Sequence, residues 1–162
     1  MRIKQMHEVK VWVDGSYSRV DGIGGIYGGG AVAYIGESDN PICFKCADTD
    51  TNWGRMRNVA GELLAVMGIV EQLSKFQDSI SRIVIFYDYD GIEKWVTGEW
   101  KAKKVCTQCY VQFMEEKKKS LNISFVHVKA HTGVANNEKA DALAKEAVRD
   151  HARRLQSNDS KE

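Results

Sequence analysis

Four acidic residues stand at the margins of apolar segments in this sequence. Two of them each follow an apolar run typical of a strand, and two lie within patterns of helical spacing. A carboxylate at the edge of buried apolar structure is costly unless positive charge or hydrogen bonds neutralise it. Four such acids, from four separate elements, predict a site that gathers cations: Asp14, Glu62, Asp88 and Asp141.

Three of these acids also have a purely structural interpretation. Asp14 or Asp88, taken alone, would serve to initiate a turn at the end of a strand. Asp141 would be a solvated acid paired with Lys145, four residues further along the same helix.

Glu62 is harder to explain structurally, because it flanks an apolar helical stripe rather than a polar face. A capping box with Asn58 does not account for it, since the acid of that motif stands three residues after the cap, where this chain has Gly61. Stabilisation of the first helical turn by the helix dipole remains the alternative.

The residue types suggest a particular chemistry. Carboxylates held close together repel one another and stay ionised only with counter-charge between them. Oxygen-only ligand sets select hard ions, which here means Mg²⁺ with Mn²⁺ as the alternative. Two such ions about 4 Å apart support in-line phosphoryl chemistry, one readying a water and the other steadying the leaving oxygen.

The elements that must position these acids are mixed in type. Alternating patterns predict strands over residues 8–14, 31–35 and 41–47, in an antiparallel meander. Helical spacing predicts a helix over residues 59–76, with Asn58 as its N-cap. The remaining predictions are strands at 81–88 and 122–128 and helices at 91–97, about 107–120 and 136 to about 154.

The run over residues 81–88 is almost continuously apolar, as expected of a central strand covered on both faces. If it lies parallel to the strand at 8–14, Asp14 and Asp88 emerge together at the carboxyl edge of the sheet. That edge is where open α/β sheets place their sites.

Composition fits one α/β domain, with 162 residues, 43% of them hydrophobic, and a net charge of +1. The charge excludes a uniformly basic nucleic-acid binder, so a polyanion would need a local patch. We expect the domain over residues 1–155 and a frayed polar tail over 156–162. No secretory signal or membrane span is recognisable, which predicts a cytoplasmic protein with no membrane partner, monomeric by default.

Two features suggest other chemistries and are interpreted structurally. Cys43 and Cys46, like Cys106 and Cys109, have zinc-ribbon spacing, but residues three apart in a strand face opposite sides. The glycine-rich segment 22–30 leads into a strand and lacks the Lys-Ser/Thr of a phosphate-binding loop. Turns and close strand packing account for it better.

Four motifs, in order along residues 10–148, carry a family resemblance: Val13-Asp-Gly-Ser16, Asn58-Val-Ala-Gly-Glu62, Tyr87-Asp-Tyr-Asp-Gly-Ile-Glu-Lys-Trp95, and Val128-Lys-Ala-His-Thr-Gly133 with Asn137-Glu-Lys-Ala-Asp141. The chain resembles the type 1 ribonuclease H family. Within it, the chain is similar to bacterial enzymes whose longer members add an N-terminal viroplasmin-like hybrid-binding module, which we expect to be lacking here.

The resemblance implies a ribonuclease H-like α/β fold, a five-stranded mixed sheet of order 3-2-1-4-5 with helices on both faces. It implies an endonuclease that cuts the RNA strand of an RNA–DNA hybrid with two Mg²⁺ ions, leaving 5′-phosphate and 3′-hydroxyl ends. It places the metal ligands on the four acids and makes His131 a helper in proton transfer or product release. The alternative for His131 is an ordinary surface histidine.

Substrate selection needs contacts to both strands. The 2′-hydroxyl, reached across the wide minor groove of an A-like duplex, distinguishes RNA from DNA, and Gly15, Ser16 and Asn58 are our candidates to read it. A basic, aromatic connection is the candidate surface for the DNA strand, unless one or both of its tryptophans belong to the core. Its residues are Trp95, Trp100, Lys101 and Lys103.

One departure from the family follows Asp88, where Tyr89 and Asp90 replace a frequent Ser-Gln pair. Asp90 either adds negative charge near the metals or points away on the next helical turn. Two other functions stay open: a non-catalytic hybrid-binding module, and a DNA-cutting relative of the integrase or resolvase kind.

Overall fold

The computed structural model describes residues 5–129 and 135–159. Its strands are β1 (His7–Val20), β2 (Gly24–Ile35), β3 (Ile42–Asp48), β4 (Ile80–Tyr87) and β5 (Ile123–His127). They form a five-stranded sheet in the order β3-β2-β1-β4-β5. β1 is antiparallel to β2 and β2 to β3, whereas β4 lies parallel to both β1 and β5. The predicted mixed sheet is therefore confirmed.

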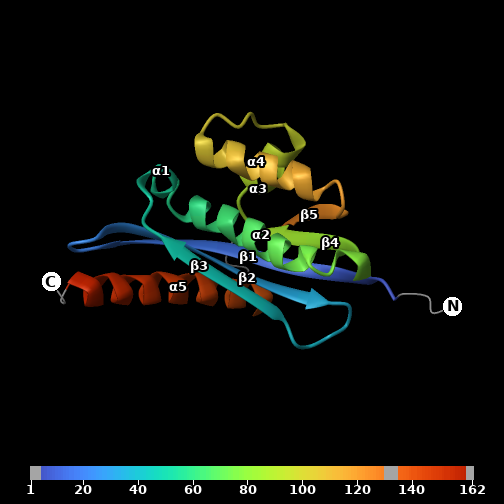
Figure 1. The fold of residues 1–162 in the computed structure, drawn as a ribbon, viewed down its shortest axis with the longest axis horizontal. Helices are drawn as coiled ribbons and strands as arrows, with labels where there is room; N and C mark the ends of the chain where they lie inside the picture. Colours follow the sequence, from blue (N-terminus) through green and yellow to red (C-terminus); the bar gives the residue numbers. More distant parts are fainter. Residues whose placement is uncertain (1–4, 130–134, 160–162) are drawn as a thin grey trace.

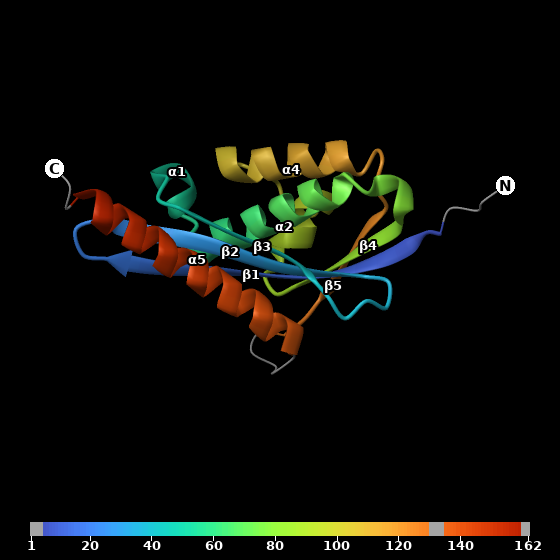
Figure 2. The same cartoon turned by 60° about the horizontal axis from the view of Figure 1, so that its bottom comes forward.

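The helices are α1 (Thr51–Gly54), α2 (Asn58–Ser74), α3 (Gly91–Thr97), α4 (Val105–Lys117) and α5 (Ala135–Asp159), with a 3-10 turn, η1, at Gln77–Ser79. α2 packs on one face of the sheet and α4 on α2, while α5 lies across β1, β2 and β3 on the opposite face (Figures 1 and 2). Within the described residues, no helix combines the length and apolar character needed to cross a bilayer.

The main hydrophobic core lies between the sheet and α2. Alternate residues of β1, namely Val9, Val11 and Val13, are buried and point toward this helix. α2 meets them with residues at helical spacing, all fully buried: Leu63, Val66, Ile69, Val70 and Leu73. The apolar periodicity of the sequence therefore does set these two elements against each other.

β1 does not end at Asp14, as the sequence suggested, but continues to Val20. Its parallel pairing with β4 stops at Trp12, while its antiparallel pairing with β2 runs on to the hairpin turn. The extension exists because β2 supplies hydrogen-bond partners where β4 no longer does. Asp14 thus lies within a strand, just past the end of the parallel pair.

Several helix ends also differ from the prediction, and two of these differences bear on the domain boundary and on Asn58. α5 continues to Asp159 rather than ending near residue 154, so it passes through the expected domain boundary at residue 155. α2 begins at Asn58 itself, and the cap position belongs to Arg57, whose φ is 54° and whose side chain makes no capping hydrogen bond. The predicted N-cap role of Asn58 is therefore wrong.

Candidate active site

Asp14 and Asp88 meet at one edge of the sheet. Asp88 directly follows β4. Asp14 stands two residues after Trp12, the last residue of β1 that pairs with β4. Because the two strands are parallel, both carboxylates emerge at the carboxyl edge, as predicted. The backbone N–H of Gly15 donates to Oδ1 of Asp14 at 2.8 Å, which holds this carboxylate against its own strand.

Glu62 reaches the same edge from α2 and is only 3% exposed. Its Oε1 accepts a hydrogen bond from the backbone N–H of Asp88 at 3.2 Å, which ties the helix to the end of β4. Burial raises the pKa of Glu62 to about 8, and the charges of Asp14 and Asp88 raise it further against the lowering effect of that hydrogen bond. A buried acid among other acids is the strongest mark of a functional site in this structure.

Asp141 completes the group from α5. Burial raises the pKa of Asp14 to about 6, and the neighbouring charges of Asp141 and Asp88, with a hydrogen bond that protonated Asp14 donates to Asp141, add to that rise. Asp141 also lies 2.8 Å from Nζ of Lys145 and is 33% exposed. Asp141 therefore forms the ion pair with Lys145 that the sequence suggested, and it also lies close enough to Asp14 to affect its charge.

These four acids, which we call the carboxylate site, come from β1, α2, the end of β4, and α5. Their mutual repulsion and their oxygen-only chemistry fit hard divalent cations. As they stand, no three Asp, Glu, His or Cys side chains among residues 5–129 and 135–159 are already arranged around an ion. A cation bound by Asp141 would compete with its ion pair to Lys145.

The zinc interpretation of the cysteines finds no support in the described part of the chain. All four cysteines are free, with Cys43 exposed and Cys106 buried. Cys46 is half-buried, and desolvation raises the pKa of its thiol to about 11. Desolvation of this kind is typical of a structural cysteine, and the structural interpretation of the four cysteines stays a prediction.

The candidates for 2′-hydroxyl recognition lie beside the carboxylate site. Gly15 packs directly on α2, since a Cβ there would stand 1.9 Å from the carbonyl oxygen of Asn58. Ser16 is half-buried on β1, and Asn58 is exposed at the start of α2. Freed from a capping role, the Asn58 side chain is available to a ligand. His131 lies outside the described residues, and its role stays a prediction.

Some residues of the connection expected to hold the DNA strand are buried in the core, and others are exposed. Trp95 is 9% exposed and packs in the core, its ring 5.7 Å from that of Trp100. The core alternative is thus the correct one for Trp95. Trp100 is half-buried with Nζ of Lys94 5.3 Å from its ring, and Lys101 and Lys103 are exposed.

Asp90 points away from the carboxylate site. Its Oδ1 lies 3.2 Å from Nε2 of His127 at the end of β5, and its Oδ2 lies 3.9 Å from Nζ of Lys94. Of the two interpretations of this fifth acid, the one in which it turns outward matches these contacts. The charges that raise the pKa of Asp14 and Glu62 come from members of the site instead.

The model of the family described as RNase H matches residues 6–149. The chain belongs to the ribonuclease H family. It is 32% identical over 157 residues to the ribonuclease H of Agrobacterium fabrum, an alignment that covers 92% of this chain and all of that relative.

Solved structures of the family share the fold. RNase H1 of the archaeon Halobacterium salinarum is 26% identical with a TM-score of 0.64, and the alignment covers 88% of this chain and 98% of that one. LC11-RNase H1, solved in complex with an RNA/DNA hybrid, has a TM-score of 0.69 at 21% identity, with 89% and 99% covered. The first of these, with the family match, supports membership in type 1; the second shows the fold alone.

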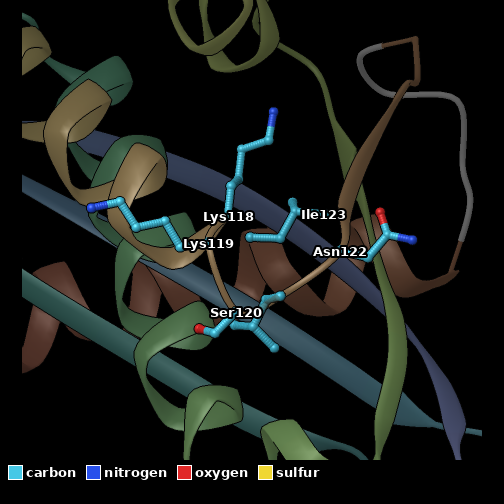
Figure 3. A pocket seen from close by; sticks show the side chains of 6 residues that line it. Lys118, Lys119, Ser120, Asn122 and Ile123 are labelled. Atoms are coloured by element: carbon cyan, nitrogen blue, oxygen red, sulfur yellow. The ribbon is translucent and has the colours of Figure 1, made fainter.

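A surface hollow lies away from the carboxylate site. A shallow pocket of about 410 Å³ is formed at the turn between α4 and β5, lined by residues 118–123 (Figure 3). It lies at the amino end of β5, whereas the carboxylates gather at the carboxyl end of the neighbouring strand. The burial of Glu62 therefore comes from its packing between α2 and the sheet, not from this pocket.

Sequence reasoning missed how closely the helices approach the sheet. The sequence predicts turns and close strand packing for the glycine-rich segment, and Gly22 and Gly24 do have positive φ at the hairpin. Gly28, Gly29 and Gly30, however, lie inside β2 and contact helices. These glycines contact α5 and α2 on alternate faces of the sheet, which can be seen only once the strand register is known.

Proposed function

We propose that this chain is an endoribonuclease that hydrolyses the RNA strand of RNA–DNA hybrids. The observation that carries the proposal is the convergence of four acids on one sheet edge, with Glu62 buried and its pKa raised to about 8. Support comes from the family membership, from relatives named ribonuclease H, and from the related fold of LC11-RNase H1 in complex with an RNA/DNA hybrid.

Asp14, Glu62, Asp88 and Asp141 would hold two divalent cations, Mg²⁺ or Mn²⁺. Bound there, such ions would supply an activated water and stabilise the leaving oxygen of the scissile phosphate. The products proposed are 5′-phosphate and 3′-hydroxyl ends.

The chain's own part in this chemistry begins with a proton. In the absence of a cation, Glu62 keeps its proton near neutral pH because its pKa lies at about 8. Its Oε1 accepts a hydrogen bond from the backbone N–H of Asp88, a contact that the ionised carboxylate can also make. Binding of a divalent cation would therefore be coupled to release of the proton from Glu62.

Binding of the hybrid would use two surfaces. The backbone at Gly15, with Ser16 and Asn58, would read the 2′-hydroxyls of the RNA strand beside the carboxylates. Lys101 and Lys103, exposed next to Trp100, would contact phosphates of the DNA strand. We also propose His131 as the helper in proton transfer or product release.

The decisive test substitutes Asp88→Asn, with Asp90→Asn as its matched control. Labelled RNA–DNA hybrid, RNA duplex and DNA duplex are incubated with Mg²⁺ or Mn²⁺, with and without chelator. We expect hybrid-only, chelator-sensitive cleavage that Asp88→Asn abolishes without loss of hybrid binding, while Asp90→Asn retains it.

Other outcomes favour the other functions. Binding of the hybrid without cleavage by the unmodified protein supports the non-catalytic module. Cleavage of duplex DNA supports the integrase or resolvase relative. Full activity of the Asp88→Asn variant contradicts the assignment of the site.

A further inference from the structure

Three consecutive buried glycines in β2 bring helices onto both faces of the sheet. Successive strand residues face opposite sides, so Gly29 faces α2, while Gly28 and Gly30 face α5. A Cβ on Gly29 would lie 2.0 Å from the carbonyl oxygen of Gly61, and one on Gly30 would lie 2.3 Å from that of Ala140. Helix backbone therefore packs directly on strand backbone, which no other residue type permits.

These two contacts lie next to the carboxylate site, both across the paired strands β1 and β2 and along the helices. In the register of β1 and β2, Gly30 pairs with Asp14, and Gly29 pairs with Gly15. Along α5, the carbonyl over Gly30 belongs to the residue before Asp141.

The α2 side repeats this arrangement. The carbonyl over Gly29 belongs to Gly61, the residue before Glu62. Gly15 adds a second contact, because its Cβ would lie 2.7 Å from the backbone nitrogen of Glu62. The acids that come from helices are thus each anchored by a neighbouring glycine contact.

We propose that Gly29 and Gly30 are positioning residues that set the depth of Glu62 and Asp141 relative to Asp14. Gly29 does so by letting α2 descend on one face of the sheet, and Gly30 by letting α5 descend on the other. The inference rests on the proposed function, since the depth matters only if the carboxylates act together on a bound cation.

The expected displacement follows from the contact at Gly30. Ordinary van der Waals contact begins at 3.4 Å, so a Cβ placed 2.3 Å from a backbone oxygen forces a shift of about 1 Å. Misplacement of a catalytic group by about 1 Å costs about 100-fold in rate. Gly30→Ala should therefore lower kcat by about that factor with little change in KM.

Gly28→Ala is the matched control on the same strand and the same helix. Its Cβ would share Ala144 with the Cβ on Gly30, at 2.8 Å from the carbonyl oxygen, and would meet Val148 at 2.7 Å, but none of its three nearest atoms belongs to Ala140, the residue before Asp141. Both variants are compared by urea unfolding, by hybrid binding in chelator, and by calorimetric titration of Mn²⁺ without substrate. We expect both to lose stability, but only Gly30→Ala to weaken Mn²⁺ binding, by at least about tenfold.

A rescue experiment separates positioning from simple loss of packing. Asp141→Glu adds one methylene and extends the carboxylate toward the sheet. In the Gly30→Ala background, where α5 stands further out, it should restore part of the Mn²⁺ affinity. In the unmodified protein and in Gly28→Ala, the same change should lower it.

Three results would overturn the inference. The first is an equal loss of Mn²⁺ affinity in Gly30→Ala and Gly28→Ala. The second is an effect of Asp141→Glu on Mn²⁺ affinity that has the same sign in all backgrounds. The third is failure of the glycine variants to fold. If Gly30→Ala does not fold, Gly29→Ala replaces it, with Gly68→Ala as its control on α2, where the three atoms nearest to the new Cβ all belong to the flexible Phe44 ring. Failure of both to fold assigns these glycines a structural role alone. Unmodified protein that binds no Mn²⁺ and cuts no hybrid refutes the proposed function instead.

Discussion

Replacing Glu62 by Gln should make the cation-free protein more stable at neutral pH while removing its activity. The substitution deletes a titrating group but keeps an oxygen that can accept the hydrogen bond from Asp88. In the folded protein the pKa of Glu62 is raised from 4.5 to about 8, chiefly by burial. The folded state therefore binds a proton that the unfolded chain releases, and the stability from this group is lost as pH rises through that window.

The magnitude follows from the two pKa values. From about pH 5 to about pH 7 the unfolded carboxyl is ionised while the folded one stays largely protonated, at about 1.4 kcal/mol per pH unit. Relative to Glu62→Gln, the unmodified protein should thus lose about 2–3 kcal/mol of unfolding free energy across this range. Saturating Mg²⁺ should reduce the loss, because cations bind the ionised site.

Urea unfolding in chelator at a series of pH values measures this difference for the two proteins. Glu71→Gln, at an exposed position of the same helix with its carboxylate 2.7 Å from Lys117, is the matched control and should add no comparable slope. A difference between unmodified protein and Glu62→Gln that stays flat from about pH 5 to about pH 7 would refute the reasoning, because it would mean that this carboxyl is not desolvated.

Two further predictions concern the connection after α3. Replacing both Lys101 and Lys103 by Ala should weaken hybrid binding and lower the slope of log K against log salt by about 2, with kcat little changed; an unchanged slope in filter-binding titrations would remove these lysines from the interface. Trp95→Ala should lower the free energy of unfolding by about 3–5 kcal/mol in urea, since the side chain is 9% exposed in the core. Lost hybrid affinity at unchanged stability would instead return Trp95 to the nucleic-acid surface.

Much of the fold was predictable because its signals are local. Apolar periodicity located α2 and the buried β4, the order of strands and helices indicated one mixed α/β domain, and the family resemblance implied the mixed sheet. The ends of elements were less predictable, since they depend on partners distant in sequence. β1 runs past Asp14 because β2 pairs with it there, and α2 starts with Arg57 in a positive-φ conformation that no local pattern indicated.

The site followed the same division. Acids at the ends and edges of apolar elements could be chosen from the sequence, because charge beside buried structure demands an explanation. Whether Trp95 faced solvent or core, and whether Asp90 turned toward the metals or toward His127, could not be chosen. Those outcomes depend on which side chains happen to lie opposite in the folded chain.

The sequence by itself determined the residue types of the carboxylate site, their order along the chain and the family to which they belong. Only the tertiary structure decided how near they stand and in what charge state. The raised pKa of Glu62 comes from burial beneath elements distant in sequence, and the depth of α2 and α5 comes from backbone contacts at Gly29 and Gly30. Desolvation and close packing are properties of the folded chain. The sequence therefore predicts which residues are ligands, but not the distances between them.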